Sequence, residues 1–313
     1  MIVDLPNTTT SKVSKEIMSL RDRGGVVALG RVLTLVIITR AGAEEEAIRA
    51  ANEASREHPC RIIVLAEGSH DEPTRLDGQI RVGGDAGASE VIVLRGYGDL
   101  ANENESLVSA LLLPDAPIVA WWPHRMPAAA AQTSIGAIAH RRITDSSNEA
   151  DPAAALFNLQ TTYSAGDTDM AWTRLTNWRI QLAAVLDQAE PSTITAVTVE
   201  GAEDSPSTVL LAAWLTLALD APVTIAAGPA GTGLHRVRLS RDNGDIELYR
   251  PGRDVAELHQ LGQPVQRISL PRRSLEECLA EELRRLDPDD VFGEVITEGL
   301  AKTNLRSVQT SER

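Results

Sequence analysis

The most constraining feature of this 313-residue sequence is an early run of β-branched and aliphatic residues. Residues 31–39, Arg-Val-Leu-Thr-Leu-Val-Ile-Ile-Thr, do not alternate between polar and apolar positions. A strand of this composition has to be covered on both faces, as strands are in the parallel sheets of α/β proteins. The run therefore predicts an α/β fold with helices on both sides of a sheet.

The rest of the first half alternates between helix and strand patterns. Further strands are predicted at residues 60–66, 90–95, 118–121 and 142–144, with a short edge strand at 79–82. Helices are predicted at residues 10–23, 43–57, 103–112 and 127–139, and at 151–162 with Asp151 as N-cap and Pro152 at the first helical position. This alternation predicts a mostly parallel sheet with right-handed crossovers.

The second half predicts a mixed sheet. A long helix is expected at residues 170–188, followed by a strand, helix and strand at 194–199, 207–219 and 223–227. Residues 235–240 and 246–250 alternate in polarity around Asn243-Gly244, which predicts an antiparallel hairpin with a type I′ turn. A strand at 265–270 and helices starting at Ser274 and Asp287 complete the chain.

The chain length and a small polar stretch predict two domains. We expect an N-terminal α/β domain at residues 1–162, a linker at 163–168, a C-terminal α/β domain at 169–301 and a flexible tail at 302–313.

Composition excludes several classes of function. The formal net charge is −14 and basic residues are not clustered, the nearest group being Pro271-Arg272-Arg273, so we expect no binding to nucleic acid or anionic membranes. The N-terminus has no apolar leader, which favours the cytoplasm. The two cysteines, Cys60 and Cys278, lie in apolar patterns and are expected to be buried thiols without a disulfide.

Sequence patterns of catalysis are weak. The six histidines show no metal-ligand spacing, so no metal and no cofactor are expected. The Gly-rich stretch at residues 228–233 lacks a Lys-Ser/Thr ending and leads into a strand, which favours an ordinary loop. Asp145-Ser146-Ser147 follows a predicted strand, but Asp and Ser form turns and caps routinely. No catalytic residue is therefore assigned.

Several tryptophan and arginine residues lie at positions where a partner or ligand contact has to be considered beside core packing. Trp121 and Trp122 are adjacent on a strand, so they point to opposite faces, and one of them is expected to face a crevice, a partner or a second layer. The alternative is that both rings fill packing gaps. On the predicted helix 170–188, Arg179 falls within the apolar arc, and Arg174 precedes Trp178 by four residues.

Several blocks together resemble the OpcA family, the glucose-6-phosphate dehydrogenase assembly proteins, over nearly the whole chain. They are residues 31–36, residues 58–64 (His-Pro-Cys-Arg-Ile-Ile-Val), residues 113–123 (Leu-Pro-Asp-Ala-Pro-Ile-Val-Ala-Trp-Trp-Pro), residues 145–147 and residues 169–179 (Asp-Met-Ala-Trp-Thr-Arg-Leu-Thr-Asn-Trp-Arg). The double-tryptophan block and the 169–179 block carry most of this resemblance.

The resemblance implies a non-catalytic protein that binds glucose-6-phosphate dehydrogenase, favours its active oligomer and raises its activity. The residues expected at the partner surface are Trp121, Trp122, Trp172, Arg174, Trp178 and Arg179. The alternative is a sugar-phosphate-binding enzyme or sensor that uses a crevice near Trp122 and Asp145, with arginines supplied at positions 125, 141 and 142.

Overall fold

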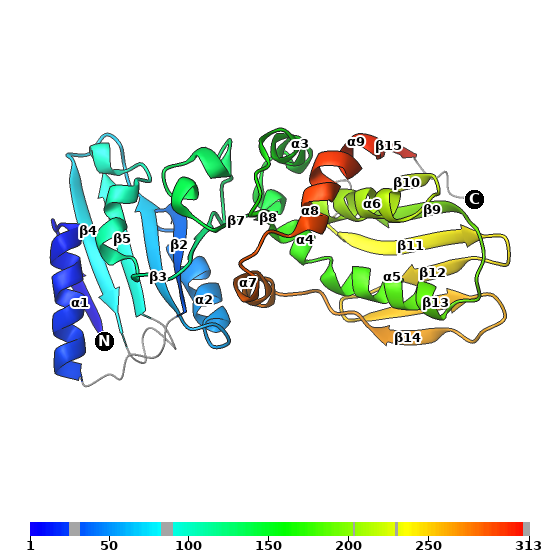
Figure 1. Cartoon of the computed structure of the whole chain (residues 1–313), viewed down its shortest axis with the longest axis horizontal. Coiled ribbons are helices and arrows are strands. Elements are labelled where there is room, and N and C mark those ends of the chain that lie inside the picture. Colours follow the sequence, from blue (N-terminus) through cyan, green and yellow to red (C-terminus); the bar gives the residue numbers. More distant parts are fainter. Residues whose placement is uncertain (25–31, 83–89, 203, 229–230, 309–313) are drawn as a thin grey trace. The chain divides into compact units, whose positions relative to one another are not determined.

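The structure is a computed structural model that describes residues 1–24, 32–82, 90–202, 204–228 and 231–308. It divides into two compact units (Figure 1). Unit 1 comprises residues 1–145, 164–168 and 275–288, and unit 2 comprises residues 146–163, 169–274 and 289–313. The predicted α/β class, with a mostly parallel first sheet and a mixed second sheet, is confirmed. No helix in the described ranges is long and apolar enough to cross a membrane.

The sheet of unit 1 has eight strands in the order β1-β4-β5-β3-β2-β6-β7-β8. The strands are β1 (Ile2–Leu5), β2 (Leu33–Arg40), β3 (Cys60–Glu67), β4 (Arg75–Arg81), β5 (Glu90–Tyr97), β6 (Ile118–Trp121), β7 (Arg141–Thr144) and β8 (Asp167–Asp169). From β5 to β7 all neighbours pair in parallel, whereas β4 is antiparallel to β5 and β1 is antiparallel to β4.

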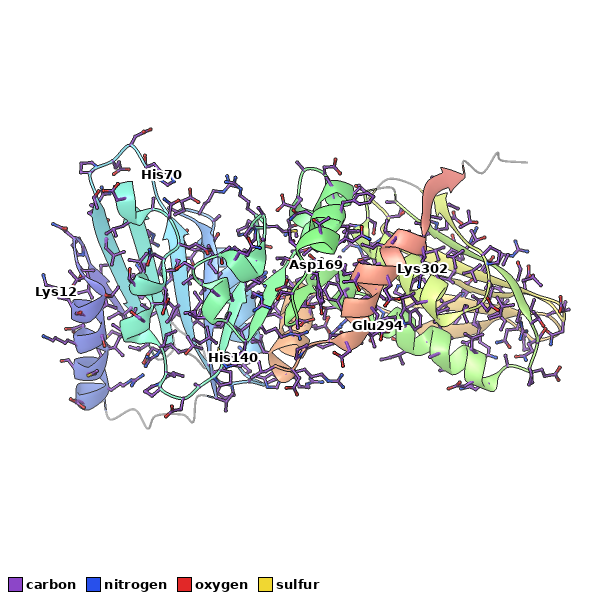
Figure 2. All side chains as sticks on the ribbon, turned by 45° about the horizontal axis from the view of Figure 1, so that its top comes forward. Lys12, His70, His140, Asp169, Glu294 and Lys302 are labelled. Carbon is purple, nitrogen blue, oxygen red and sulfur yellow. The ribbon has the colours of Figure 1, made fainter. Side chains whose placement is uncertain are left out.

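Helices cover both faces of this sheet, as the continuous apolar strands require. Helix α1 (Thr10–Gly24) buries Val13, Ile17 and Leu20 in the cluster that includes Ala120 and Trp122. Its Lys12 lies on the opposite, exposed face (Figure 2). Helix α2 (Glu44–Ala54) contacts β2, β3 and helix α7 (Leu275–Arg284).

Three expectations for unit 1 are wrong. The strand at 79–82 is longer and internal, because the unpredicted β1 pairs with it and forms the edge. The helix expected at 103–112 is two 3-10 turns, η3 (Glu105–Leu107) and η4 (Ser109–Leu111), and the one at 127–139 is also two turns, η5 (Ala130–Gln132) and η6 (Gly136–Ile138). Asn104 caps η3 and Gly136 interrupts the second segment, where local side-chain bonds and glycine disfavour a continuous helix.

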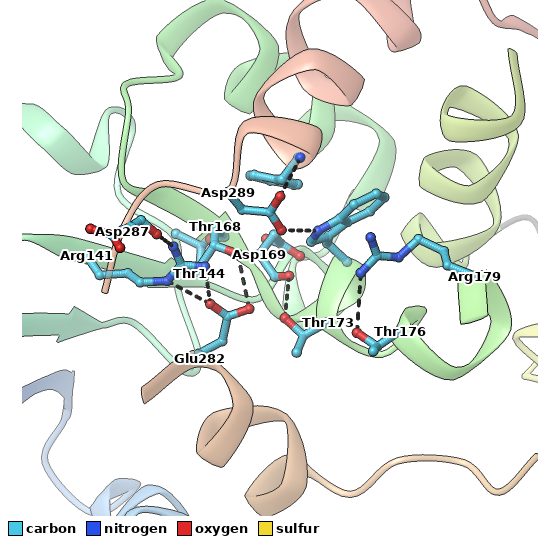
Figure 3. Close-up of polar contacts among 12 residues, drawn as sticks. Arg141, Thr144, Thr168, Asp169, Thr173, Thr176, Arg179, Glu282, Asp287 and Asp289 are labelled. Carbon is cyan, nitrogen blue, oxygen red and sulfur yellow. Dashed lines mark hydrogen bonds and ion pairs between the residues drawn. The ribbon is translucent and has the colours of Figure 1, made fainter. Parts of the chain in front are cut away.

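Buried ion pairs connect strands and helices of unit 1. Arg141 of β7 donates from Nε to Glu282 Oε2 of α7 at 2.8 Å, and its Nη1 donates to the Asp287 carbonyl at 2.8 Å (Figure 3). The next residue, Arg142, pairs with Asp167 of β8. Each of these charges is satisfied by a partner, which is the condition under which charges are tolerated inside proteins.

The sheet of unit 2 has seven strands in the order β14-β13-β12-β11-β9-β10-β15. They are β9 (Ile194–Gly201), β10 (Val223–Ala227), β11 (Leu234–Arg241), β12 (Ile246–Tyr249), β13 (Val255–Gln260), β14 (Gln266–Ser269) and β15 (Asn304–Val308). Strands β9, β10 and β15 are parallel, and the remaining neighbours are antiparallel. The helices are α3 (Pro152–Thr162), α4 (Met170–Thr173), α5 (Thr176–Gln188), α6 (Pro206–Ala218), α8 (Asp290–Glu294) and α9 (Leu300–Lys302).

The start of α3 is confirmed in detail, because Asp151 accepts a hydrogen bond from the Ala154 N–H at 2.9 Å. The long helix expected at 170–188 is wrong, since α4 and α5 are separated by a tight turn in which Leu175 N–H donates to the Trp172 carbonyl. The predicted hairpin exists, but Asn243 is not at positive φ and the turn is therefore not type I′.

The C-terminal segment also departs from expectation. Asp289, rather than Asp287, caps α8 by accepting from the Phe292 N–H. The helix continues through a π turn, η8 (Val295–Gly299), into α9, on which Lys302 is labelled in Figure 2. Strand β15 follows, where a frayed tail was expected, and residues 309–313 lie outside the described residues.

The two compact units do not coincide with the domains expected from the sequence. Residues 146–163, most of which were expected in the N-terminal domain, belong to unit 2. Residues 164–168, within the expected linker, and residues 275–288 both belong to unit 1. Independent folding of residues 1–162 and 169–301 stays a prediction.

Candidate functional site

The parallel strands of unit 1 reverse their order between β2 and β6. Open α/β sheets place ligand crevices outside the carboxyl ends of strands at such a point. A cavity of about 390 Å³ lies there, lined by the ends of β2 and β3 together with Glu103, Trp122 and His124. The cavity lies beside Trp122, as expected, but Asp145, which was expected near the same crevice, is not among its lining residues.

The two adjacent tryptophans differ in surroundings. Trp122 is 3% exposed, lines the cavity and donates from Nε1 to Glu103 Oε2 at 3.0 Å. Trp121 is fully buried and, by strand alternation, points to the opposite face of the sheet. One ring thus faces a crevice, as expected, while both rings also contribute to the core.

The start of α2 carries a carboxylate at the position where nucleotide-binding folds hold phosphate. In those folds the turn after the first strand leads into a helix whose N-terminal amides bind the pyrophosphate. Here Glu44, 3% exposed, accepts from the Gly42 N–H at 2.5 Å and pairs with Arg95 at 2.6 Å. Glu45 and Glu46 follow in the same turn of α2. This helix start is negatively charged and disfavours anions.

Unit 2 brings two of the sequence blocks together around Asp169. The Ser146 N–H and hydroxyl donate to the two oxygens of Asp169 at 2.9 and 2.8 Å. The Asp169 carboxylate also accepts from the Ala171 N–H at 2.9 Å and caps α4, and its carbonyl accepts from Thr173 (Figure 3). Ser146 is fully buried, which agrees with the interpretation of this serine cluster as a cap and turn rather than a nucleophile.

Trp172 is held on three sides. Its Nε1 donates to Asp289 Oδ2 at 2.9 Å, and its ring packs against Phe292 at a centroid distance of 5.8 Å. The guanidinium carbon of Arg179 lies 3.8 Å from the Trp172 ring centroid, and Arg179 Nη2 donates to the Thr176 hydroxyl (Figure 3). Trp172 is 1% exposed, whereas Arg179 is partly exposed. The arginine therefore covers the ring and is itself only partly exposed.

A second cavity, of about 360 Å³, lies in unit 2. Its wall includes Arg174, Trp178, Arg250, Arg272 and Arg273. The cation–π contact that the structure shows on Trp178 comes from Arg250, at 5.2 Å, and Arg174 donates to the Ser147 hydroxyl at 3.1 Å. In the segment Pro271-Arg272-Arg273 the first two residues are exposed and Arg273 is half-buried, and both arginines line this cavity.

The six residues expected at a partner surface are divided between the units. Unit 1 holds Trp121 and Trp122, and the other four lie in unit 2, where the structure joins Trp172 to Arg179. The four rings are at most 3% exposed, whereas Arg174 and Arg179 are partly exposed.

Of the three arginines suggested for a sugar phosphate near Trp122, Arg125 lines the cavity, whereas the other two are paired elsewhere. Arg141 and Arg142 hold buried carboxylates, and Asp145 is 2% exposed. Within the part of the chain that the structure describes, no three His, Cys, Asp or Glu side chains form a group that could hold a metal ion.

Several solved structures of oxidoreductases match this chain at low sequence identity. One is an oxidoreductase from Sinorhizobium meliloti, with 9% identity and a TM-score of 0.48, where the match covers 86% of this chain and 94% of that chain. Another is an inositol dehydrogenase homolog from Azotobacter vinelandii, with 11% identity and a TM-score of 0.48, where the match covers 88% of this chain and 95% of that chain. Glucose-6-phosphate 1-dehydrogenase from Mycobacterium avium also matches, with 13% identity and a TM-score of 0.44, over 90% of this chain and 94% of that chain. No curated protein matches this chain.

Two protein-family models match consecutive parts of the sequence. Residues 51–161 match the N-terminal domain of the glucose-6-phosphate dehydrogenase subunit, and residues 165–296 match its C-terminal domain. Together the two models cover most of the chain, in the order that the family has. The chain therefore belongs to the OpcA family of glucose-6-phosphate dehydrogenase subunits.

Proposed function

We propose that this chain is an assembly and activating subunit of glucose-6-phosphate dehydrogenase, and that it acts in the cytoplasm without a catalytic site of its own. The observation that carries the proposal is the family match, which places both subunit domains in order along residues 51–161 and 165–296. The match does not favour the alternative of a sugar-phosphate enzyme near Trp122.

The start of α2 in unit 1 supports the non-catalytic part of the proposal. A dehydrogenase of this general architecture would bind its dinucleotide at the start of α2. Glu44 already accepts the amide of Gly42 there, and two further carboxylates lie in the same turn. A pyrophosphate would have to displace Glu44 from Arg95 and approach Glu46 and Glu45, the second of which is paired with Arg81.

The Trp/Arg residues provide the proposed contact surface. Because the rings of Trp121, Trp122, Trp172 and Trp178 are buried, their role would be to hold neighbouring side chains in place. Arg179, stacked on Trp172, and Arg174 are partly exposed side chains of unit 2. Rigidly supported arginines are favoured at interface hot spots, because little conformational entropy is lost on binding.

The purified chain, prepared in a host that lacks its own glucose-6-phosphate dehydrogenase, is expected to leave NADPH fluorescence unchanged and to reduce no NADP⁺ with glucose 6-phosphate. The physical reason is the negative charge at the start of α2. A fluorimetric titration and an absorbance assay check both statements. Saturable NADPH binding, or turnover proportional to the amount of chain, would contradict the non-catalytic proposal.

A further inference from the structure

Four arginines line the second cavity of unit 2, although the chain carries a formal net charge of −14. They are Arg174, Arg250, Arg272 and Arg273, and they come from three separate stretches of sequence. The acidic residue in the lining is the exposed Asp204. A concentration of positive charge in one concave site favours an anionic ligand.

Arg250 is the most buried of these cations. It follows β12 and is 7% exposed, with Nη2 donating to the Leu234 carbonyl at 2.9 Å and Nη1 to the Leu270 carbonyl at 3.2 Å. Its buried Nε has no hydrogen-bond partner among the described residues. Burial and the nearby Arg272 lower the pKa of Arg250 to about 10, with an opposing effect from the charge of Asp254, so the guanidinium is still charged at neutral pH. A buried cation without a carboxylate partner is costly unless an anion completes the site.

The neighbouring arginines are held in place by backbone carbonyls. Arg273 Nη1 donates to the Thr173 carbonyl at 2.7 Å, and Arg272 Nη2 donates to the Thr232 carbonyl. Carbonyl oxygens orient a guanidinium without neutralising its charge, and a guanidinium has five N–H donors. Arg250 and Arg272 make no ion pair within the described ranges. Their charge is therefore available to a ligand.

A helix N-terminus contributes to the same wall. Helix α6 has 13 residues, and its first residues, Pro206 and Ser207, line the cavity beside the N-cap Ser205. The Ser205 side chain makes no capping hydrogen bond, and the first turn holds no acidic residue. The first amides of a helix can bind phosphate. In α6 Pro206 has no N–H and the Thr208 N–H donates to the Ser205 carbonyl, so the amide at the cavity wall that can serve an anion is that of Ser207. The start of α6 is thus the opposite of the start of α2, where three glutamates repel anions.

We propose that this cavity binds a small metabolite carrying a phosphate monoester, with the phosphate between the start of α6 and the guanidinium groups of Arg250, Arg272 and Arg273. Guanidinium forks match phosphate oxygens bidentately. The volume of about 360 Å³ is at the lower end of small-molecule sites, which suits a sugar phosphate better than a dinucleotide. Ser205 lines the cavity and brings a hydroxyl group to the polar part of the ligand. The inference goes beyond the proposed function and does not depend on it.

The test is a calorimetric titration of the intact chain, alone, with ribose 5-phosphate at physiological ionic strength. We expect saturable binding at one site per chain, competition by inorganic phosphate, and no binding of the neutral sugar ribose. Arg272→Gln removes an exposed guanidinium and is expected to weaken binding about tenfold or more, since a hydrogen bond to a charged group contributes substantially. Arg267→Gln, on the exposed strand β14, is the matched control and is expected to bind normally.

Three results would overturn the proposal. They are the absence of saturable binding, equal affinity in Arg272→Gln and the unchanged chain, and equal affinity for the dicarboxylate succinate, which would assign the cavity to carboxylates. Arg250→Lys retains charge but not the fork, and is expected to weaken phosphate binding if it folds. Because no dehydrogenase is present, a failure here is separate from a failure of the assembly function.

Discussion

Replacing Glu282 with alanine is expected to lower the free energy of unfolding by about 3–5 kcal/mol, because Arg141 would remain buried without its carboxylate partner. Arg141 is 3% exposed and Glu282 is 4% exposed, and two nitrogens of Arg141 donate to Glu282 Oε2. The Thr168 hydroxyl donates to the other oxygen at 3.3 Å. Urea unfolding monitored by tryptophan fluorescence measures the loss.

A double variant distinguishes the effect of losing the ion pair from the effect of losing side-chain volume. Arg141→Met combined with Glu282→Leu removes both charges and keeps apolar volume, so it is expected to recover a large part of the stability lost in Glu282→Ala. Glu282→Gln, which retains the shape, is expected to fall between the two. If Glu282→Ala unfolds like the unchanged chain, the ion pair does not hold unit 1 together.

Replacing Arg179 with alanine is expected to raise the concentration of chain needed to activate the dehydrogenase about 30-fold. A hot-spot residue has this effect when its replacement costs about 2 kcal/mol of binding free energy. Arg174→Ala should act in the same direction. Folding should survive, because the cation–π contact on Trp172 contributes only about 0.5–2 kcal/mol. Trp178→Ala would instead cost about 3–5 kcal/mol of stability through its cavity and obscure the assay.

The same preparations should be compared for thermal midpoint and activation. Arg267→Ala, exposed on β14, is the control for loss of a surface charge. Arg179→Lys keeps the charge but loses the planar stacking on Trp172, and should be intermediate. If the Arg179→Ala chain folds and activates the dehydrogenase normally, the partner surface does not include this part of unit 2.

The fold could be predicted where burial alone dictates composition. Residues 31–39, 60–66 and 90–95 are continuous apolar runs because β2, β3 and β5 are covered on both faces. Helix starts with a strong local signal, such as Asp151-Pro152, were also correct. The crevice beside Trp122 followed from the rule that strand ends in such sheets border ligand sites.

Other features depend on contacts that a linear pattern does not contain. The break between α4 and α5 was missed because the apolar periodicity continues through Leu175, although Asp169 caps one helix and the next starts at Thr176. Strand β1 is short and half-exposed, so its sequence gives little signal until β4 pairs with it. The arginine cavity was missed because it joins residues 174, 250 and 272–273, which are distant in sequence.

The central claim is that this chain associates with glucose-6-phosphate dehydrogenase and raises its activity. The most direct test is sedimentation velocity of the purified dehydrogenase from the same organism, with and without the chain, together with its rate at saturating substrate. The account predicts a co-sedimenting complex, a larger dehydrogenase oligomer and a higher rate per dehydrogenase subunit. Identical sedimentation and identical rate in the presence of excess chain would contradict it.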